Sequence, residues 1–477
     1  MSALQKFHIR PPVLPLRPAE RRSLLFFGDV LAVILAWMTA VYFWWAENGL
    51  VLGFPGRGYI AELPLWFFFL PLVWLVLLVE LYTPYKASRW RETVRGVFFA
   101  GMVGLALYLL IYFTSPPRSL PRKGVAVFFM AAMAYTLTWR YLYIRLLGGG
   151  RFARRALVVG TGRAARAVLE AIRQASERPF QVVGLIDDDL SKQNKEILGI
   201  PVLGTSHDLL PLMQTHGVSD VIVAITGEMS GRQFQALLDA QDRGAEISTM
   251  AAVYEELLER VPIQHLDADW LIRSFVDEAR VSAFYRLGKR ILDVLGGLAG
   301  VLALALVYPW IALAIVLESG FPVLFKQPRA GRGGDIFVMY KFRTMRPASP
   351  EIEQGRWLVE DEHRITRVGR FLRKTHLDEF PQFINVLRGE MSLVGPRPEQ
   401  RSLIEHLEKR IPFYRARLMV KPGVTGWAQV NYGYVTTIRE TEIKLEYDLY
   451  YIKHRNLLFD VVIILRTLST VLGGKGR

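Results

Sequence analysis

Residues 373–382 read Arg-Lys-Thr-His-Leu-Asp-Glu-Phe-Pro-Gln, and the organisation of the chain can be followed outward from them. Two adjacent carboxylates, Asp378 and Glu379, follow a basic pair and precede an apolar run. Proline fits an α-helix only in its first turn, so Pro381 predicts a helix that begins near Asp378 and ends at Gly389. The positive end of a helix favours phosphate and keeps a carboxylate ionised. The stretch is therefore a candidate phosphate site.

Plain helix capping is the alternative interpretation of the same residues. Asp is a common N-cap, and Glu is common in the first turn of a helix. Taken alone, Asp378 and Glu379 are more often a cap than a site. The chemistry of the surrounding chain has to separate the two interpretations.

Composition indicates a membrane protein. The 477-residue chain is long enough for about two to four domains, and 51% of its residues are hydrophobic. Its mean hydropathy is +0.22, which is high for a soluble protein. The formal net charge of +15 suits anionic lipid headgroups or phosphorylated ligands, and no nucleic-acid-binding motif is present. The absence of cysteine excludes a disulfide framework and thiolate chemistry.

Residues 1–150 are predicted to form a bundle of four membrane spans. Each of four apolar runs is close to the roughly 20 residues that cross a bilayer: Ser23–Trp45, Leu63–Tyr82, Val94–Phe113 and Val125–Leu147. Basic residues flank the runs: Arg10, Arg17, Arg21, Arg22, Lys86, Arg89, Arg91, Arg95, Arg145, Arg151, Arg154 and Arg155. Because Lys and Arg favour the cytoplasmic side, both ends of the bundle are expected inside the cell. Asp29 and Arg140, near span edges, are expected to be structural rather than part of a transport path.

Residues 151–275 are predicted to form a Rossmann-like α/β domain with a doubly wound parallel sheet. A short strand, Ala156–Val159, runs into the glycine turn that contains Gly160 and Gly162 and then into an amphipathic helix. A second strand ends at Asp187, and a third begins at Asp220. The pattern fits a turn that binds a dinucleotide phosphate through Gly160 and Gly162. It also fits a tight turn without any ligand, and a lone glycine loop is a weak signal.

A long apolar run opens the C-terminal region, residues 283–477. Val294–Leu317 contains Gly296, Gly297, Gly300 and Pro309. A simple crossing would place the Lys- and Arg-rich remainder outside the cell, which the charge rule disfavours. Since Pro309 can break a helix, we expect a re-entrant helix at about residues 290–318 that dips into the membrane and returns. An ordinary kinked span is the alternative.

Basic and glycine-rich segments follow this run. Lys326–Gly334 includes Arg329, and Tyr340–Met345 includes Lys341 and Arg343. Guanidinium groups and backbone amides of this kind gather around phosphate. Arg397 stands between two prolines, which would hold it ready for a two-point phosphate contact. A solvated basic face and a rigid loop are the competing interpretations. The final apolar run, Leu457–Leu472, is short and amphipathic, and we expect it in the interface plane.

Five motifs in this order resemble the bacterial sugar transferase family of polyprenyl-phosphate glycosyl-1-phosphate transferases. They are Lys289–Asp293, Tyr340–Met345, Leu377–Gln382, Leu393–Pro398 and Lys421–Gln429. The likeness covers about Tyr285 to the C-terminus. With the preceding spans and α/β domain, the chain resembles large polytopic members, the undecaprenyl-phosphate glucose and galactose phosphotransferases above all. The family's helix break is often Ser-Pro, whereas Tyr308-Pro309 stands here.

The resemblance implies transfer of a hexose 1-phosphate, glucose or galactose, from a UDP-sugar to undecaprenyl phosphate. UMP is released, and the reaction is the first membrane step of exopolysaccharide, capsule or O-antigen synthesis. It implies a mostly helical, monotopic catalytic domain on the cytoplasmic face of the bacterial inner membrane, in contact with membrane lipid. A homodimer is expected by analogy with the large members.

The resemblance also assigns roles to individual residues. Asp378 would be the nucleophile of a phosphosugar-aspartate intermediate, and Glu379 would hold Mg²⁺. Adjacent helix positions point about 100° apart, so the two carboxylates should not share one task. Arg373 would meet the polyprenyl phosphate. The remaining substrate-binding candidates are Lys341, Arg343, Arg329 and Arg397.

Two other classes of function remain open at this point. The Gly160 turn could belong to a nucleotide-sugar oxidoreductase or epimerase, but no Tyr-x-x-x-Lys pair follows it at suitable spacing. A non-catalytic scaffold of polysaccharide assembly is the other alternative. The intact Asp378-Glu379 pair argues against it.

Overall fold

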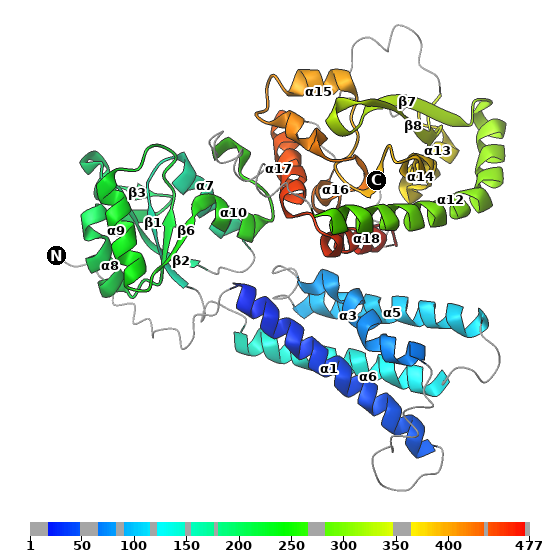
Figure 1. Ribbon diagram of the computed structural model, residues 1–477, viewed down its shortest axis with the longest axis horizontal. Helices are drawn as coiled ribbons and strands as arrows, with labels where there is room; N and C mark the ends of the chain where they lie inside the picture. The colour runs from blue at the N-terminus through cyan, green and yellow to red at the C-terminus, as the bar shows by residue number, and fades with distance from the viewer. Residues whose placement is uncertain are drawn as a thin grey trace. The chain divides into compact units, whose positions relative to one another are not determined.

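The computed structural model describes residues 18–47, 65–82, 90–114, 122–147, 154–175, 180–265, 282–346, 364–433 and 437–472. The chain forms two compact units, Met1–Val253 and Tyr254–Arg477 (Figure 1). Several basic residues that flank the predicted spans fall outside the described ranges: Arg10, Arg17, Lys86, Arg89 and Arg151.

A helical bundle begins the first unit. Its helices are α1 (Pro18–Glu47), α3 (Leu70–Leu77), α5 (Trp90–Thr114) and α6 (Arg122–Leu147). Phe67, Trp74 and Phe128 are buried in a shared apolar core. Three described helices are long and apolar enough to cross a membrane, at Ser23–Phe43, Gly124–Leu146 and Ala283–Ser319. The chain is therefore a membrane protein of mixed α and α/β character.

The predicted second span is not one continuous helix. A 3-10 helix, η1 (Leu65–Phe69), precedes the eight-residue α3, and a second 3-10 helix, η2 (Val79–Tyr82), follows it. Proline lies in the first turn of α3, where its missing N–H costs no helical hydrogen bond. Four complete crossings stay a prediction.

Asp29 and Arg140 meet inside the bundle. Arg140 Nη2 lies 2.7 Å from Asp29 Oδ2, and Arg140 Nη1 donates to the Leu81 carbonyl at 3.0 Å. Both side chains are buried. A buried charge pair with added hydrogen bonds ties α1 to α6, as expected for a structural pair.

The second part of this unit is a six-stranded sheet in the order β3-β4-β2-β1-β5-β6. Its strands are β1 (Arg154–Val159), β2 (Phe180–Ile186), β3 (Glu196–Ile197), β4 (Ile200–Gly204), β5 (Asp220–Val223) and β6 (Glu246–Thr249). All pairings are parallel except β3 with β4. Figure 1 shows α8 (Leu209–His216) and α9 (Gly231–Asp242) on one side of the sheet and α7 (Arg163–Gln174) on the other. The doubly wound parallel sheet is confirmed, with one short antiparallel edge strand.

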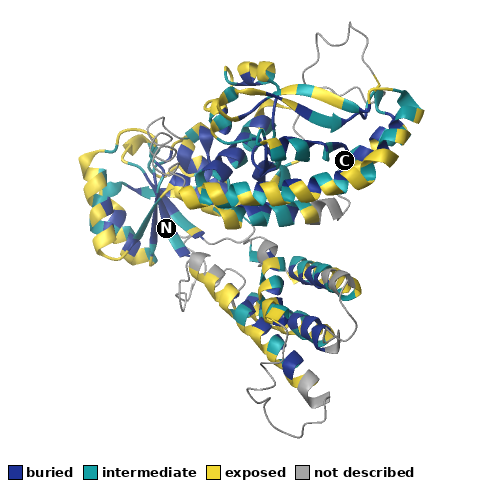
Figure 2. Ribbon diagram, turned by 45° about the vertical axis from the view of Figure 1, so that its right-hand side comes forward, coloured by how far each residue is buried: buried dark blue, intermediate teal, exposed yellow. Residues whose placement is uncertain are grey.

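The second unit is built on α12 (Ala283–Ser319), a helix of 37 residues with Pro309 in its interior. Its ribbon bends sharply in the C-terminal half (Figure 1), where a proline removes one backbone hydrogen bond. Exposed positions recur along the ribbon of α12 (Figure 2), and the large apolar residues among them follow one another at helical spacing. They are Phe284, Leu287, Ile291, Leu295, Leu298, Leu302, Leu306, Trp310, Leu313 and Leu317. We call this set the apolar stripe.

The remainder of the second unit packs on the opposite side of α12. It comprises β7 (Leu324–Ala330), β8 (Ile336–Phe342), α13 (Arg367–Thr375), η9 (Leu377–Glu379), α14 (Gln382–Arg388), β9 (Ser392–Val394), α15 (Arg401–Leu407), η10 (Tyr414–Met419), β10 (Gly423–Thr425), α16 (Trp427–Asn431), α17 (Ile438–His454) and α18 (Leu457–Leu472). The strands form two small sheets, an antiparallel β7–β8 pair and a parallel β9–β10 pair. The domain is mostly helical.

The boundary between the two units differs from the predicted one. We expected the α/β domain to extend to residue 275, but Tyr254 onward belongs to the second unit. The reason lies in side chains after α10 (Met250–Leu258). Val261 and Ile263 are buried in the apolar core of the second unit. Burial of two branched side chains there contributes stability that an exposed linker would lack.

Candidate active site

The two carboxylates lie in the tight turn η9 rather than in an α-helix. α13 ends at His376, whose φ of 58° is left-handed, and η9 follows at once. Hydrogen bonds between residues three positions apart hold the turn. Glu379 N donates to the His376 carbonyl and Phe380 N donates to the Leu377 carbonyl, both at 3.2 Å. Pro381 has no N–H with which to continue an α-helical ladder from this turn. α14 therefore begins at Gln382, which corrects the predicted start near Asp378, and it ends before Gly389 as expected.

Glu379 is held by two cations. Lys341 Nζ donates to its Oε1 at 2.9 Å, and Arg397 Nη2 donates to the same oxygen at 2.6 Å. Arg397 Nη1 reaches Oε2 at 3.3 Å. Lys341 comes from β8 and Arg397 from the loop after β9, so three separate segments meet at one carboxylate. A two-point Arg contact of this kind fixes orientation as well as charge.

Asp378 lies beside this group without sharing its bonds. Its side chain is 8% exposed. Within the described parts of the chain, no hydrogen bond or ion pair engages the Asp378 carboxylate. The charges of Lys341, Arg397 and Arg373 nevertheless act on it. The result is an available carboxylate in a cationic setting.

The two neighbouring carboxyl groups titrate in opposite directions. Burial and the negative charge of Glu379 raise the pKa of Asp378 above its ordinary value, against the opposing effect of the nearby cations. Burial would also raise the pKa of Glu379, but the charges of Arg397 and Lys341 outweigh it and hold that pKa well below its usual range. Of the two carboxyl groups, Asp378 therefore binds a proton more readily, and Glu379 stays ionised.

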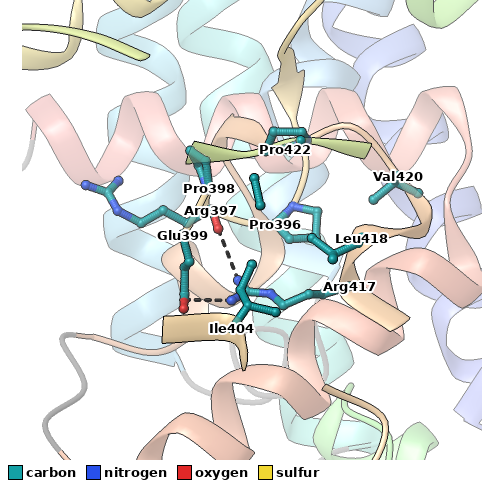
Figure 3. A pocket seen from close by; sticks show the side chains of 11 residues that line it. Pro396, Arg397, Pro398, Glu399, Ile404, Arg417, Leu418, Val420 and Pro422 are labelled. Carbon is teal, nitrogen blue, oxygen red and sulfur yellow. Dashed lines mark hydrogen bonds and ion pairs between the residues drawn. The ribbon is translucent and has the colours of Figure 1, made fainter. Parts of the chain in front are cut away.

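Arg397 depends on a buried network that the sequence did not indicate. Its backbone carbonyl accepts from Arg417 Nη2 at 3.1 Å. Arg417 also pairs with Glu399 at 2.6 Å and with Asp448 at 2.9 Å. Figure 3 shows Arg417 joined to Glu399 and to the Arg397 backbone, while the Arg397 side chain extends away from them. Glu399 directly follows the Pro-Arg-Pro motif and could have been suspected, but Arg417 and Asp448 lie far along the chain.

Arg373 and Arg329 lie close to the carboxylate pair. Arg373 Nε donates to Thr344 Oγ1 at 3.1 Å, and its charge favours the ionised form of Asp378. Arg329 Nη2 donates to Gln327 Oε1 at 2.6 Å and its Nη1 to the Pro398 carbonyl at 3.4 Å. Burial, together with the charge of Arg397, lowers the pKa of Arg329 to about 10. Both arginines remain candidate ligands of an anion.

Arg343 has a structural task in this structure. Its Nη1 donates to the Phe321 carbonyl at 2.8 Å, and its Nη2 donates to the Ser319 carbonyl at 2.9 Å and to the Gly320 carbonyl. These carbonyls end α12, and orphan carbonyls at a helix end need donors. Arg343 therefore caps the end of α12, and its predicted phosphate contact stays a prediction.

Comparisons with known proteins show the family to which the chain belongs. The family model for bacterial sugar transferases matches residues 284–474. A UDP-glucose:undecaprenyl-phosphate glucose-1-phosphate transferase of Caulobacter vibrioides is 44% identical over 39% of this chain and 70% of its own length. The chain belongs to the bacterial sugar transferase family.

For two further relatives the match covers a larger share of this chain but a smaller share of the relative's own length. A UDP-N-acetylgalactosamine-undecaprenyl-phosphate N-acetylgalactosaminephosphotransferase of Aeromonas hydrophila is 43% identical over 47% of this chain. An undecaprenyl-phosphate glucose phosphotransferase of Komagataeibacter xylinus is 32% identical over 67% of it. The matches span 52% and 59% of those two relatives. A second family model, described as a CoA-binding domain, matches residues 78–251.

In this sugar transferase, both ends of α12 are fastened to the rest of the second unit, Tyr254–Arg477, which we call the catalytic unit. Near its start, Arg290 donates to the Val386 and Leu387 carbonyls at 3.1 and 2.9 Å, and Asp293 accepts from Ser392 Oγ at 2.8 Å. Near its end, Glu318 accepts from the backbone N–H groups of Arg367 and Val368 at 2.7 and 2.8 Å. The Lys289–Asp293 motif is thus a fastening of α12 to α14 and β9.

Close approach of α14 requires small residues on α12. A Cβ atom at Gly300 would lie 2.3 Å from the Phe383 ring, and one at Gly297 would lie 2.9 Å from Leu387. Both partners belong to α14, which directly follows the Asp378 turn. The glycines noted in the sequence therefore set the distance between the apolar helix and the carboxylate pair.

The described residues contain no metal site made of protein groups alone. Within the ranges that the structure describes, no group of three or more His, Cys, Asp or Glu side chains could hold a metal ion. Asp378 and Glu379 offer carboxylate oxygens side by side. Such a pair suits Mg²⁺ when substrate phosphates supply the remaining ligands.

The glycine turn of the α/β domain lines a separate hollow of about 210 Å³. Gly160 has φ of 111°, and a Cβ there would lie 2.6 Å from the Ala224 carbonyl oxygen. Asp187, at the end of β2, accepts from Thr161 Oγ1, from Asp189 N at 2.9 Å and from Lys192 Nζ at 3.2 Å. The acidic group that would face a dinucleotide ribose is thus bonded within the domain itself.

Proposed function

We propose that this chain transfers a sugar 1-phosphate from a UDP-sugar to undecaprenyl phosphate and releases UMP. The names of the Caulobacter and Komagataeibacter relatives describe transfer of glucose phosphate to undecaprenyl phosphate. The observation that carries the proposal is the division of labour at residues 378 and 379. One carboxylate is available and basic, and the other is fixed between Lys341 and Arg397.

In the first step an Asp378 carboxylate oxygen attacks the sugar-bearing phosphorus of the UDP-sugar. A P–O bond forms to Asp378, and the bond from that phosphorus to the UMP oxygen breaks. The electron pair leaves with UMP. Lys341, Arg397 and Arg329 lie where they can take up charge on the diphosphate and on the departing UMP.

In the second step an oxygen of undecaprenyl phosphate attacks the same phosphorus and expels the Asp378 carboxylate. The products are the lipid diphosphate sugar and the regenerated enzyme. Arg373 is the proposed contact of the lipid phosphate. Two steps keep the two anionic substrates from having to meet in one transition state.

Membrane geometry supports a lipid substrate. The apolar stripe on α12 runs along a helix whose two ends are both fastened to one compact unit. A helix that crossed the bilayer would carry its ends to opposite faces. We therefore place α12 as a re-entrant helix that dips into the cytoplasmic leaflet of the inner membrane, with the catalytic unit in the cytoplasm.

Mg²⁺ belongs to the proposal as the metal of a substrate complex. Glu379 would hold it together with substrate phosphate oxygens, and the ion would neutralise charge on the diphosphate. An incoming diphosphate competes for Lys341 and Arg397, which would release Glu379 oxygens for this task.

The proposal also specifies the sugar, the pathway and the ligand of the α/β domain. Glucose or galactose is the proposed sugar, and the name of the Aeromonas relative adds N-acetylgalactosamine to the panel to be tested. The proposed place is the first membrane step of exopolysaccharide, capsule or O-antigen synthesis, with a homodimer as the working form. Gly160 and Gly162 are proposed to face a nucleotide in the hollow beside them.

The deciding experiment measures UMP release from a panel of UDP-sugars with undecaprenyl phosphate and Mg²⁺. Asp378→Asn is expected to lose turnover by about 1000-fold or more, because a covalent step needs its nucleophile. Because the folded protein raises the pKa of Asp378, the neutral Asn should leave the thermal midpoint unchanged or higher. Without lipid acceptor, a UDP-sugar labelled at the sugar-bearing phosphate should label wild-type protein and spare Asp378→Asn. Equal labelling of both proteins would remove Asp378 as nucleophile.

A further inference from the structure

Residues 254–265 join the catalytic unit although they precede the region matched by the sugar transferase family model. We call this segment the brace. Its Tyr254 Oη donates to Glu446 Oε2 at 3.2 Å, and Gln264 Nε2 donates to Glu442 Oε2 at 2.6 Å. Glu255 pairs with Lys453 Nζ at 3.1 Å. These contacts run along α17.

The brace contacts made by Glu255 and to Glu446 are buried, whereas the Gln264–Glu442 hydrogen bond is exposed. Glu255 and Glu446 are 6% and 8% exposed. Arg260 Nε lies 3.4 Å from Glu446 Oε2, and His454 Nε2 lies 3.1 Å from Glu255 Oε2. Val261 and Ile263 alone would be enough to bury the apolar surface of the brace, so the polar contacts are additional to that burial. Buried, directional charge contacts fix geometry in addition to excluding water.

The opposite side of α17 faces the active-site network. Lys444 Nζ lies 2.9 Å from Glu399 Oε1, and Asp448 Oδ2 lies 2.9 Å from Arg417 Nη2. At about 100° per residue, positions 444 and 448 lie roughly 180° around the helix from 442, 446 and 453. α17 is therefore held between the brace and the residues that support Arg397.

We propose that the brace is a positioning element of the active site, acting through α17 on Arg397. The connection has three steps. The brace fixes α17, α17 fixes Glu399 and Arg417, and Arg417 holds the Arg397 carbonyl at 3.1 Å. Arg397 in turn orients Glu379. This inference rests on the proposed function, since positioning is defined by the transfer reaction.

The test uses the full-length protein and a double-mutant cycle. Tyr254→Phe with Glu255→Gln forms the brace variant, Arg417→Lys disturbs the network, and a third protein carries all three changes. Misplacement of about 1 Å can cost up to about 100-fold in rate, so about tenfold in kcat is expected from each disturbance. Because both act on Arg397, the combined protein should lose about tenfold rather than about 100-fold. Glu405→Gln, which removes an exposed pair on α15 with Arg401, is the matched control and should retain wild-type kcat.

A second measurement reads the same connection without turnover. Hydrogen exchange of the backbone around residues 392–402 should quicken in the brace variant and stay at the wild-type rate in Glu405→Gln. Losses of kcat that multiply, or unchanged exchange at residues 392–402 with only a lower thermal midpoint, would overturn the proposal. If the brace variant does not fold, the isosteric Glu446→Gln replaces it in both measurements.

Failure of the proposed function would look different. Wild-type protein that releases no UMP from any UDP-sugar rejects the transfer reaction, while the exchange measurement still decides whether the brace fixes the Arg397 loop. Wild-type turnover with multiplicative losses rejects the brace alone.

Discussion

The carboxylate pair at Asp378 and the glycine turn at Gly160 are both suited to phosphate, yet they are built from different parts. The first gathers cationic side chains from β8 and from the loop after β9 around an available carboxylate. The second consists of backbone turns, and its acidic residue, Asp187, is already bonded within its own domain. The site proposed for covalent chemistry leaves the Asp378 carboxylate without a hydrogen bond among the described residues, whereas the glycine turn has its acidic residue bonded locally. Changes to the two regions should therefore differ in what they disturb.

Among the changes that compare the two regions and leave Asp378 in place, Arg397→Lys is expected to have the largest effect. Arg397→Lys removes the two-point contact to Glu379, because lysine has a single charged nitrogen. We expect turnover to fall about 100-fold, the scale of losing one preorganised donor. Steady-state UMP release is the measurement. Gly162→Ala, in the other region, should leave turnover at the wild-type level because no atom lies within 4 Å of the added Cβ. Equal losses of turnover in Arg397→Lys and Gly162→Ala would contradict the expected difference between the two regions.

The next largest difference is expected in the thermal stability of a glycine variant from each region. Gly300→Val places side-chain atoms where the Phe383 ring lies, and overpacking of this kind costs about 1–3 kcal/mol. A lower thermal midpoint and slower turnover are expected together, since α14 follows the Asp378 turn. Gly162→Ala is the control and should change stability by less than about 0.5 kcal/mol. An unchanged midpoint in Gly300→Val would show that α14 does not need its close approach to α12.

The pH dependence of turnover offers a smaller, signed test. In the proposed mechanism Asp378 attacks as an ionised carboxylate, and its pKa is raised above the ordinary 3.8. Turnover should therefore be full at neutral pH and decline as pH falls through a value above 3.8. In the other region, burial opposes ionisation of Asp187, but hydrogen bonds from Thr161 and Asp189 and the Lys192 charge lower its pKa. Its bonds should survive until the pH drops below 3.8. An acid limb of kcat at or below that value would contradict the raised pKa of Asp378.

The smallest effect is expected from Thr161→Val. It removes the hydroxyl that donates to Asp187 and leaves the catalytic unit untouched. Loss of one partly exposed hydrogen bond costs about 1 kcal/mol, and turnover should match wild type. Calorimetry of the full chain measures the loss of stability, and UMP release measures turnover. Reduced turnover would reveal that the α/β domain influences the reaction.

Local sequence patterns predicted the residues of the candidate site better than they predicted the surrounding residues that hold them in place. The order of motifs was enough to single out Asp378, Glu379, Lys341 and Arg397, and Gly389 marked the end of α14. The start of that helix was wrong because Pro381 separates a tight turn from the α-helix. Arg343 could not be recognised as a helix cap, since its partners at Ser319 and Gly320 lie more than twenty residues away.

The larger fold shows the same limit. The alternation of strands and helices predicted the parallel sheet, because that pattern is local. The brace escaped notice, because it is defined by contacts with Glu442 and Glu446, which lie almost 200 residues further along the chain. Asp448, a buried partner of Arg417, lies only 31 residues further along the chain, but periodicity and composition carry no sign of that pair either.

The apolar stripe on α12 has a practical consequence for anyone who prepares this protein. Ten large apolar side chains, from Phe284 to Leu317, belong to the same folded unit as the carboxylate pair. Deleting residues 1–150 would therefore not yield a water-soluble enzyme. Detergent, nanodiscs or another amphiphile has to accompany even the shortest active fragment. Activity measured in different amphiphiles will report partly on how well each one covers α12.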